Sequence, residues 1–201
     1  MAVPRQVLRY LSHPQVEIDP AVPVPDWPLN AVGHARVAAL AQVARDRLGD
    51  SRSVFSSPER KARDAAMPLA QALGLSVSIA EDSGEIDRSA TGFLHQTAFE
   101  ATADAFFAQP DQSVDGWERA TDAQNRILNS IHAMISRAPD GDMLVIGHGA
   151  VGTLLFCACA RLPISRAYDQ APGGGGNVLE FDRETLEIKE EWVSMERYFH
   201  V

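Results

Sequence analysis

The sequence predicts an α/β protein: a three-layer α/β/α sandwich built around a mainly parallel, mixed sheet. Short apolar runs typical of buried strands alternate with longer segments of helical periodicity, a pattern that favours parallel strands joined by helices. Hydrophobic residues make up 45% of the 201 residues and charged residues 22%, which suits one globular core. We interpret residues 1–201 as a single domain with an insertion at about 80–118.

The first half of the chain is expected to contain three strands and two helices. The predicted strands cover residues 6–12, 53–55 and 75–79. A proline-dense loop from Pro14 to Pro28 follows the first strand, because proline fits neither a helix interior nor a central strand. The first helix is predicted from the cap Asn30 to about Leu48, and its expected apolar stripe is Val32, Val37, Leu40 and Val43.

The second predicted helix begins at Ser57-Pro58-Glu59, which supplies a cap, a proline in the first turn and an early acid, and it ends near Leu73. The polar 80–118 insertion is expected to include a short helix over 97–108. The remaining predicted elements are a helix over about 115–137, a strand over Met143–Ile146, a helix from Gly149, and two strands near 177–181 and 186–193.

Charge and composition exclude several functional classes. The formal net charge of −9 argues against a general surface for nucleic acid or anionic membranes. Residues 143–160 carry no formal charge, which is the lower limit for a membrane span, but His148 and three glycines there favour a buried strand followed by a buried helix. The N-terminus lacks the apolar run of a signal peptide, and Cys157 and Cys159 have no disulfide or metal pattern. We therefore expect a cytoplasmic protein.

Three short polar segments each follow a predicted strand. They are Ser12-His13-Pro14, Ser56-Ser57-Pro58-Glu59-Arg60-Lys61 and Gly147-His148-Gly149. In an open α/β sheet, ligands bind at the carboxyl ends of the strands, so the three segments are expected to meet at one site. A single histidine in a loop is usually structural, and the coincidence of all three segments is what indicates a function.

The segment from Gly147 to Gly152 also satisfies the dinucleotide-binding pattern G-x-G-x-x-G. Its context does not fit that function. Only 49 residues follow Gly152, and Asp169, the acid at the expected distance, does not end an apolar strand. A dinucleotide site is therefore the weaker interpretation.

The ordered motifs resemble those of the histidine phosphatase superfamily, also called the phosphoglycerate mutase-like family. The resemblance rests on five segments, in order: Ser12-His13-Pro14, Leu29-Asn30-Ala31-Val32-Gly33, Ser56-Ser57-Pro58-Glu59-Arg60-Lys61-Ala62, Gly84-Glu85-Ile86-Asp87 and Gly147-His148-Gly149. It covers residue 6 to about 181, and it implies the phosphoglycerate mutase-like fold.

The resemblance also implies roles for individual residues. His13 matches the histidine that attacks phosphorus and carries the phosphoryl group, a role that suits a largely neutral imidazole. Its second ring nitrogen should donate to a backbone carbonyl. His148 matches the second histidine, which binds a phosphoryl oxygen, and Glu85 matches the acid that protonates the leaving oxygen and then activates water. Such a site needs no metal and no cofactor, because positioning and electrostatics can suffice.

Two positions depart from the family pattern, and each lacks an arginine. Ser12 stands before the nucleophile and Lys61 stands before Ala62, so phosphate would be held by a hydrogen bond and a point charge. We expect Arg88, and after it Arg60, to compensate. The helix beginning at Gly149 is expected to aim backbone amides at the anion.

The leading hypothesis is a phosphatase that hydrolyses a small phosphate monoester, or a phosphoprotein, through phosphohistidine on His13. A mutase is the alternative within enzymes. The loss of arginine at Ser12 and Lys61 also allows a non-catalytic member that only binds phosphate or a phosphoprotein. The insertion, with Phe93, Phe99, Phe106, Phe107 and Trp117, is expected to cover the site, its aromatic rings serving mainly as packing groups. Oligomeric state is left open.

Overall fold

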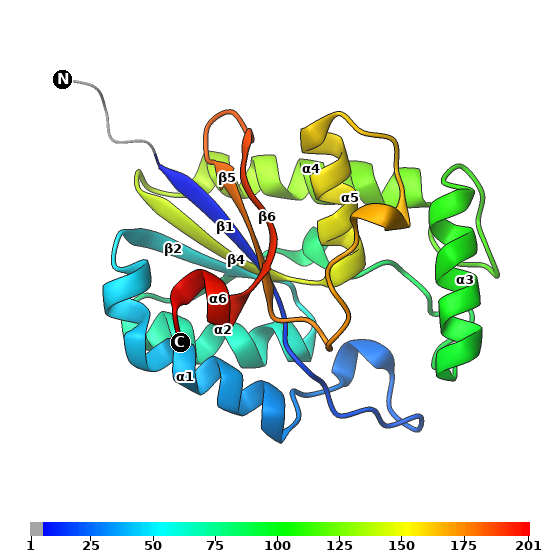
Figure 1. Ribbon diagram of the computed structural model, residues 1–201, viewed down its shortest axis with the longest axis horizontal. Coiled ribbons are helices and arrows are strands. Elements are labelled where there is room, and N and C mark those ends of the chain that lie inside the picture. The colour runs from blue at the N-terminus through cyan, green and yellow to red at the C-terminus, as the bar shows by residue number, and fades with distance from the viewer. Residues whose placement is uncertain (1–5) are drawn as a thin grey trace.

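The computed structural model describes residues 6–201 as a layered α/β fold, seen along its shortest axis in Figure 1. Its sheet has six strands in the order β3-β2-β4-β1-β5-β6. They are β1 (Val7–Ser12), β2 (Ser51–Ser56), β3 (Val77–Ile79), β4 (Asp142–Gly147), β5 (Asn177–Asp182) and β6 (Ile188–Ser194). The first four strands are parallel, whereas β5 is antiparallel to β1 and β6 to β5. The predicted mixed, mainly parallel sheet is confirmed.

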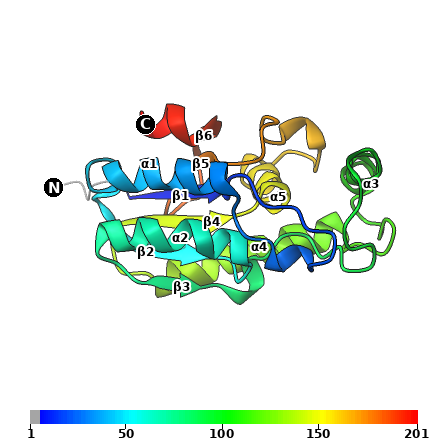
Figure 2. The same ribbon diagram turned by 90° about the horizontal axis from the view of Figure 1, so that it is seen from below.

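Helices cover both faces of this sheet, as Figure 2 shows from below. One layer contains α1 (Ala31–Leu48), α2 (Arg60–Leu73) and α6 (Met195–Phe199), and the other contains α4 (Ala120–Arg137) and α5 (Gly149–Ala160). The helix α3 (Gln96–Ala108) stands apart, beyond one end of the sheet (Figure 1). Three short 3-10 helices complete the fold: η1 (Val24–Asp26), η2 (Glu81–Ser83) and η3 (Arg166–Tyr168).

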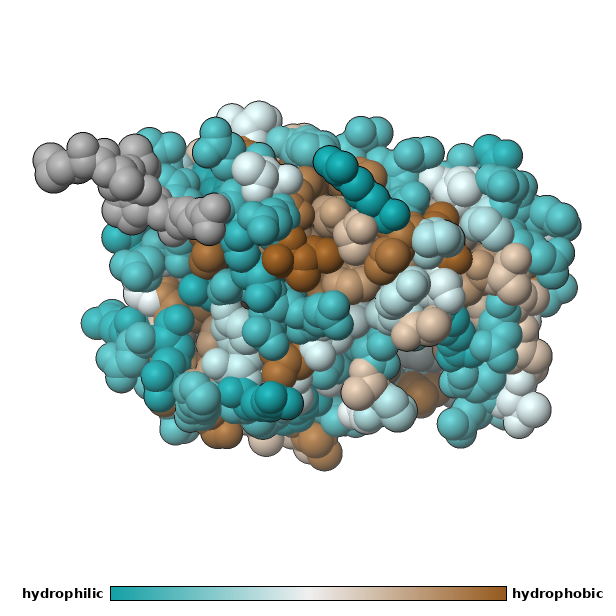
Figure 3. Space-filling model, turned by 45° about the horizontal axis from the view of Figure 1, so that its top comes forward, coloured by the Kyte–Doolittle hydropathy of each residue, from teal (hydrophilic) through white to brown (hydrophobic). Residues whose placement is uncertain are grey.

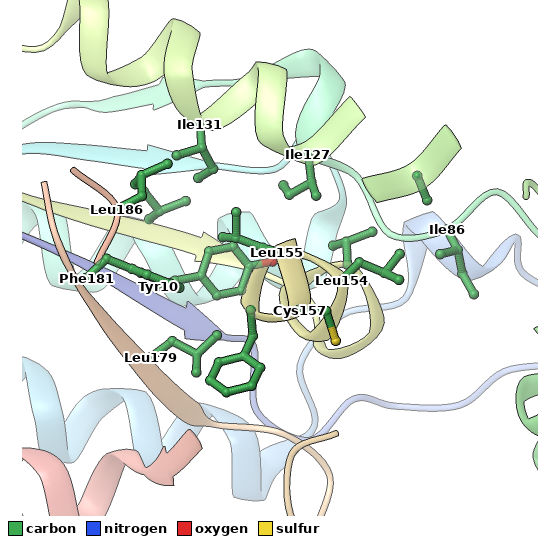
Figure 4. Close-up of a cluster of buried hydrophobic side chains, with 14 of the residues drawn as sticks. Tyr10, Ile86, Ile127, Ile131, Leu154, Leu155, Cys157, Leu179, Phe181 and Leu186 are labelled. Carbon is green, nitrogen blue, oxygen red and sulfur yellow. The ribbon is translucent and has the colours of Figure 1, made fainter. Parts of the chain in front are cut away.

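The side chains of each strand alternate between two hydrophobic clusters. Tyr10 of β1 packs with Leu154 and Phe181 in the cluster under α4 and α5, part of which Figure 4 shows. The next residue, Leu11, packs with Leu40 in the cluster under α1 and α2. This period of two follows from the pleat of the strand, so burial of both faces requires apolar residues at successive positions.

The α1 helix begins where the sequence predicts, and its buried face is partly different. The Asn30 side chain accepts a hydrogen bond of 2.9 Å from the Gly33 N–H, which satisfies one of the free donors in the first turn. Val37 and Leu40 are buried as expected. Val32 is 55% exposed, so its place in the apolar stripe was wrong, and Ala44 and Leu48 extend the buried face instead.

Other element ends differ from the prediction for backbone reasons. The α4 helix begins at Ala120 and not near 115, because Asp115 and Gly116 have φ angles of 51° and 80°, outside the helical region. Leu186 has a φ of 56°, which delays β6 to Ile188. The helix α2 begins at Arg60, two residues after the predicted start. The short helix α6 was not predicted.

Residues 143–160, considered above as a membrane span, form β4 and α5 around His148. None of the helices within residues 6–201 combines the length and the apolar character that crossing a bilayer requires. Cys157 and Cys159 are free thiols, the first of them buried. The signal-peptide prediction rests partly on residues 1–5, which lie outside the described residues. The face in Figure 3 is mostly hydrophilic, with apolar residues gathered near its middle.

Candidate active site

The carboxyl ends of β1, β2 and β4 bring three of the predicted polar segments together. The His13 N–H donates to the Gly147 carbonyl at 2.9 Å, and the Ser57 N–H donates to the Ile146 carbonyl at 3.1 Å, so the ladder continues into the loops. The rings of His13 and His148 meet edge to face, with centroids 5.2 Å apart. The two histidines that were predicted from the sequence as site residues are therefore direct neighbours.

The half-buried His13 ring has a defined tautomer. Its Nδ1 lies 2.8 Å from the Pro14 carbonyl oxygen. A carbonyl can only accept, so Nδ1 carries the proton and Nε2 keeps its lone pair. Burial lowers the pKa of His13 to about 4, against the opposing effect of the Pro14 carbonyl and with the help of the Lys61 charge. His13 is thus a neutral imidazole at pH 7, with Nε2 available as a nucleophile.

His148 is completely buried at the start of α5. Its Nε2 lies 2.7 Å from the Ser57 hydroxyl and 3.5 Å from a Glu59 carboxylate oxygen. Burial lowers the pKa of His148 to about 3, although the Glu59 charge acts in the opposite direction. Its Nδ1 is buried and has no hydrogen-bond partner among the residues described. A buried polar atom without a partner is uncommon, and a catalytic role is one of the explanations for it.

Tyr10 fixes the backbone of His148, a role that the sequence did not indicate. The Tyr10 hydroxyl donates to the His148 carbonyl at 3.0 Å and accepts from the His148 N–H at 2.9 Å. A Cβ atom at Gly147 would lie 2.2 Å from the Tyr10 hydroxyl oxygen, so only glycine leaves room for this contact. The glycine before His148 therefore serves the packing of Tyr10.

Glu85 occupies the N-terminus of α5. Its carboxylate accepts from the Ala150 N–H at 3.1 Å and from the Val151 N–H at 3.0 Å. Burial raises the pKa of Glu85, as does the Glu59 charge, while these N–H groups and that of Ile86 act against the rise. The amides that were expected to face a phosphate thus already hold a carboxylate. The Arg126 guanidinium donates to the Glu85 carbonyl at 3.1 Å and fixes this loop.

Lys61 and Glu59 form a buried ion pair behind the histidines. Lys61 is only 4% exposed, and its Nζ also donates to the Val24 carbonyl at 2.9 Å. Glu59 accepts from the Glu85 N–H at 2.7 Å. Burial raises the pKa of Glu59, but the nearby His148 and Lys61 outweigh burial and lower it to about 2. The sequence predicted Glu59 only as a helix-start acid, because nothing along the chain shows which side chains surround it.

Ser12, which stands where the family has arginine, holds a side chain from another loop. Its hydroxyl accepts from the Asn177 N–H at 3.0 Å and donates to the Gln170 amide oxygen at 2.7 Å. The Asn177 side-chain amide donates to the same oxygen at 2.9 Å. The Gln170 Nε2 therefore faces Gly149, where an added Cβ would lie 2.2 Å from it. Gln170 was missed because it is distant in sequence from every motif.

The two arginines proposed as compensating cations have different surroundings. Arg88 lies with its Cζ 4.9 Å from the centre of the Phe99 ring, and its side chain makes no hydrogen bond or ion pair with the described residues. Burial lowers the pKa of Arg88, while the charges of Glu85 and Glu59 act in the opposite direction. Arg60 is 54% exposed in its side chain and lies 3.9 Å from Asp64. Of these two, Arg88 is the one beside the site.

An open pocket of about 760 Å³ leads to His13 and Glu85. Its walls come from the His13 loop, the Glu85 loop, α3, the start of α5, and η3 with the loop that follows it. The lining residues are His13, Gln15, Val16, Ile18, Asn30, Glu85, Ile86, Gln96, Phe99, Glu100, Ala103, Phe106, Phe107, Gly149, Ala150, Arg166, Asp169, Gln170, Ala171, Pro172, Gly173, Gly174 and Gly175. Phe99, Phe106 and Phe107 thus both pack and line the pocket, whereas Trp117 is 1% exposed and only packs.

The glycine-rich loop closes over the His13 backbone. A Cβ atom at Gly175, whose φ is 82°, would lie 2.1 Å from the His13 carbonyl oxygen. Arg36 of α1 donates to the Gly175 carbonyl at 2.9 Å and forms an ion pair with Glu196. Within residues 6–201, no group of three or more His, Cys, Asp or Glu side chains is arranged to hold a metal ion. His34, His95, His132 and His200 are exposed.

Comparison with known proteins gives one family and a consistent fold. The sequence model of the histidine phosphatase superfamily (branch 1) matches residues 16–192. No curated protein matches the chain. Among solved structures, a mycobacterial glucosyl-3-phosphoglycerate phosphatase is 20% identical, with a TM-score of 0.72 over 94% of this chain and 99% of that one.

Two further structures have the same fold. YhfR of Bacillus stearothermophilus is 17% identical, with a TM-score of 0.73 over 91% of this chain and 94% of that one. A phosphoserine phosphatase of Entamoeba histolytica, in complex with 3-phosphoglyceric acid, is 13% identical, with a TM-score of 0.71 over 94% and 98% of the two chains.

Proposed function

Because the chain belongs to the histidine phosphatase superfamily, we propose that it hydrolyses phosphate monoesters through a phosphohistidine on His13. One observation carries this proposal: the neutral His13 ring donates from Nδ1 to the Pro14 carbonyl, which leaves the Nε2 lone pair at the base of an open pocket. A nucleophile with a fixed tautomer is prepared for in-line attack on phosphorus.

In the first proposed step, the lone pair of His13 Nε2 forms a bond to phosphorus and the bond from phosphorus to the ester oxygen breaks. The leaving oxygen takes its proton from the Glu85 carboxyl group. The raised pKa of Glu85 favours this role, because it keeps more of the carboxyl in its acid form than an exposed glutamate would have.

In the second step, water replaces the alcohol. Glu85, now a carboxylate, accepts a proton from the water, and the water oxygen forms a bond to phosphorus. The bond between phosphorus and Nε2 breaks, which releases inorganic phosphate and restores neutral His13. Glu85 regains its proton, so one residue serves as acid and then as base.

Three groups are proposed to hold the phosphoryl oxygens. His148 has a buried Nδ1 without a partner in the described chain, Gln170 directs its amide nitrogen toward Gly149, and Arg88 has an unpaired guanidinium. A bound phosphoryl dianion would raise the pKa of His148 and favour its charged form. The opposite charge would then stabilise the transition state.

The other predicted phosphate ligands receive indirect roles in this proposal. Ser12 acts by orienting Gln170, and Lys61 acts through its charge and through its ion pair with Glu59. Gly149 leaves room for the Gln170 amide. Arg60 has the weakest support, since its side chain is largely exposed and lies near Asp64.

One observation favours a second candidate, a member that binds phosphate without turnover. Lys61 replaces an arginine of the family, and its charge is largely balanced by the buried Glu59. The remaining positive charge at the site is therefore small, which would weaken stabilisation of the transition state.

A panel of phosphate esters, assayed in the presence of EDTA, tests the proposal. We expect multiple turnovers by the wild-type protein and a loss of at least about 10³-fold for His13→Ala. The exposed His34→Ala variant, on α1, is the matched control and should keep wild-type activity. Binding of phosphate without hydrolysis would favour the non-catalytic member, and interconversion of phosphate isomers would favour the mutase.

A further inference from the structure

The charged side chains that line the pocket beside His13 indicate which phosphate esters it can bind. Three carboxylates line it, those of Glu85, Glu100 and Asp169, and Arg166 is the one cationic side chain among the described lining residues. Glu85 belongs to the proposed chemistry. Asp169 and Glu100 line the same pocket and take no part in that chemistry, so they can face the alcohol part of the substrate.

The positive charge of Arg166 is already paired within the protein and is not available to a ligand. Its guanidinium forms an ion pair with Glu100, a second with Asp104 at 2.5 Å, and a hydrogen bond to the Glu100 backbone carbonyl at 3.1 Å. Two carboxylates of α3 therefore face one guanidinium of η3. The net charge of this cluster is negative. Arg88, which has no ion pair among the described residues, is assigned above to the phosphoryl group.

Asp169 adds a further negative charge to the pocket. One of its oxygens accepts from the Thr153 hydroxyl at 2.9 Å and from the Gln170 N–H at 2.8 Å. The second oxygen has no partner among the described residues. The rest of the wall combines apolar side chains, among them Ile86 and Phe99, with uncharged polar ones, among them Gln96. Among the described lining residues it adds no lysine or arginine that could neutralise a second anionic group.

We propose that the pocket selects phosphate esters whose alcohol part is cationic or neutral and rejects those with a carboxylate or a second phosphate. This inference rests on the proposed function, and it names the substrate class of the same site. An ammonium group could lie near Asp169 and Glu100, whereas a carboxylate there would meet like charge without a free cation.

Two pairs of esters that differ in one carboxylate test the inference. O-phosphoethanolamine is compared with O-phosphoserine, and glycerol 3-phosphate with 3-phosphoglycerate. We expect kcat/KM to be at least about tenfold higher for the first member of each pair. The same four esters are titrated by calorimetry into His13→Ala, so that binding preference is measured even without turnover.

A variant that removes the partners of Arg166 tests whether this ion-pair cluster causes the preference for esters without a carboxylate. The double variant Glu100→Gln with Asp104→Asn leaves Arg166 unpaired, and we expect the ratio between phosphoethanolamine and phosphoserine to fall by about tenfold. The control is Asp46→Asn, an exposed position near the far end of α1, which should not change the ratio.

Two results separate this inference from the proposed function. Equal or better hydrolysis of both carboxylated esters would overturn the inference and leave the phosphatase in place. If no ester is hydrolysed, the phosphatase proposal fails. The inference is then decided by the ratios of the dissociation constants that calorimetry measures for the two members of each pair. Equal or tighter binding of the carboxylated esters would contradict it.

Discussion

His13, His148, Glu59 and Glu85 lie close together, yet their pKa values shift in different directions. Burial lowers the pKa of both histidines and raises that of Glu85, because in each case it disfavours the charged form. Glu59 is the exception, because the neighbouring His148 and Lys61 favour its carboxylate. The site therefore combines neutral imidazoles with a carboxyl group whose pKa is raised, a combination that favours a nucleophile and an acid.

These shifts predict the pH dependence of catalysis. His13 must be deprotonated, so kcat/KM should rise with pH through about 4. Glu85 must be protonated, so kcat/KM should fall as the pH exceeds its raised pKa. We expect a bell-shaped profile, measured with a substrate whose own ionisation is corrected for. A profile that keeps rising to pH 9 would contradict the assignment of Glu85.

Glu85→Gln should lower kcat for an alkyl phosphate by about 10²–10⁴-fold, because the leaving oxygen loses its proton donor. The loss should be much smaller for p-nitrophenyl phosphate, whose leaving group needs no proton. Glu81→Gln, at an exposed position in the adjacent η2, serves as the control. Equal losses on the two substrates would show that Glu85 is not the acid.

Gln170→Ala should weaken binding of inorganic phosphate by about tenfold, the effect of one hydrogen bond to a charged group. The inhibition constant of phosphate measures this change directly. Gln112→Ala, at an exposed position outside the pocket, should leave the constant unchanged. An unchanged constant for Gln170→Ala would remove Gln170 from the proposed phosphate contacts.

At the scale of the element, the sequence predicts most of the architecture. The strand and helix order follows from apolar periodicity, and His13 and His148 could be selected because each directly follows a strand. Ser12 and Lys61 could be identified as departures, but not their partners Gln170 and Glu59. Gln170 reaches Ser12 from a loop that only the folded sheet brings near it. Glu59 is only two residues from Lys61, but its contact with His148 depends on the fold, so no local pattern shows its environment.

The element ends were predicted less well, because they depend on single backbone angles. Asp115 and Gly116 resemble a helix start in composition, yet their positive φ angles place the first turn of α4 later. The exposure of Val32 has a different origin. The buried face of α1 runs through Gly33, Val37 and Leu40 at helical spacing, and Val32 lies one residue off that face.

The start of α1 provides a test at this scale. Asn30→Ala removes the cap of Gly33 and the hydrogen bond of 3.1 Å to the Val16 carbonyl. We expect the free energy of unfolding in urea to fall by about 1 kcal/mol. Gln42→Ala, at an exposed position in the same helix, should change it by less than about 0.5 kcal/mol. A similar change in both variants would argue against the cap.

At the scale of the whole molecule, the half-buried His13 and the fully buried His148 couple stability to pH. Their folded pKa values, about 4 and about 3, lie below the usual value near 6.5 of an unfolded chain. Their contribution is full above pH 6.5 and is lost as the pH falls toward the folded values. The contribution of Glu59, with a pKa of about 2, persists until the pH falls below about 4.5.

The free energy of unfolding should therefore fall between pH 7 and pH 5 by roughly 2 kcal/mol for each of the two histidines. Urea titrations at the two pH values measure the change. His148→Gln should reduce the dependence on pH by about half, whereas His34→Gln, at an exposed position, should not alter it. The same dependence on pH in the wild type and in His148→Gln would show that His148 is not held neutral by burial.

The central claim is that His13 carries the phosphoryl group during turnover. The most direct test is to stop the reaction rapidly with base and to look for the phosphoryl group on the protein. The protein is mixed with a hydrolysed ester, quenched in base, and digested for mass spectrometry. We predict a base-stable, acid-labile phosphoryl group on the peptide that contains His13, with accumulation in Glu85→Gln if breakdown becomes slower. Turnover with no phosphoryl group on His13, or with the group on another residue, would contradict the account.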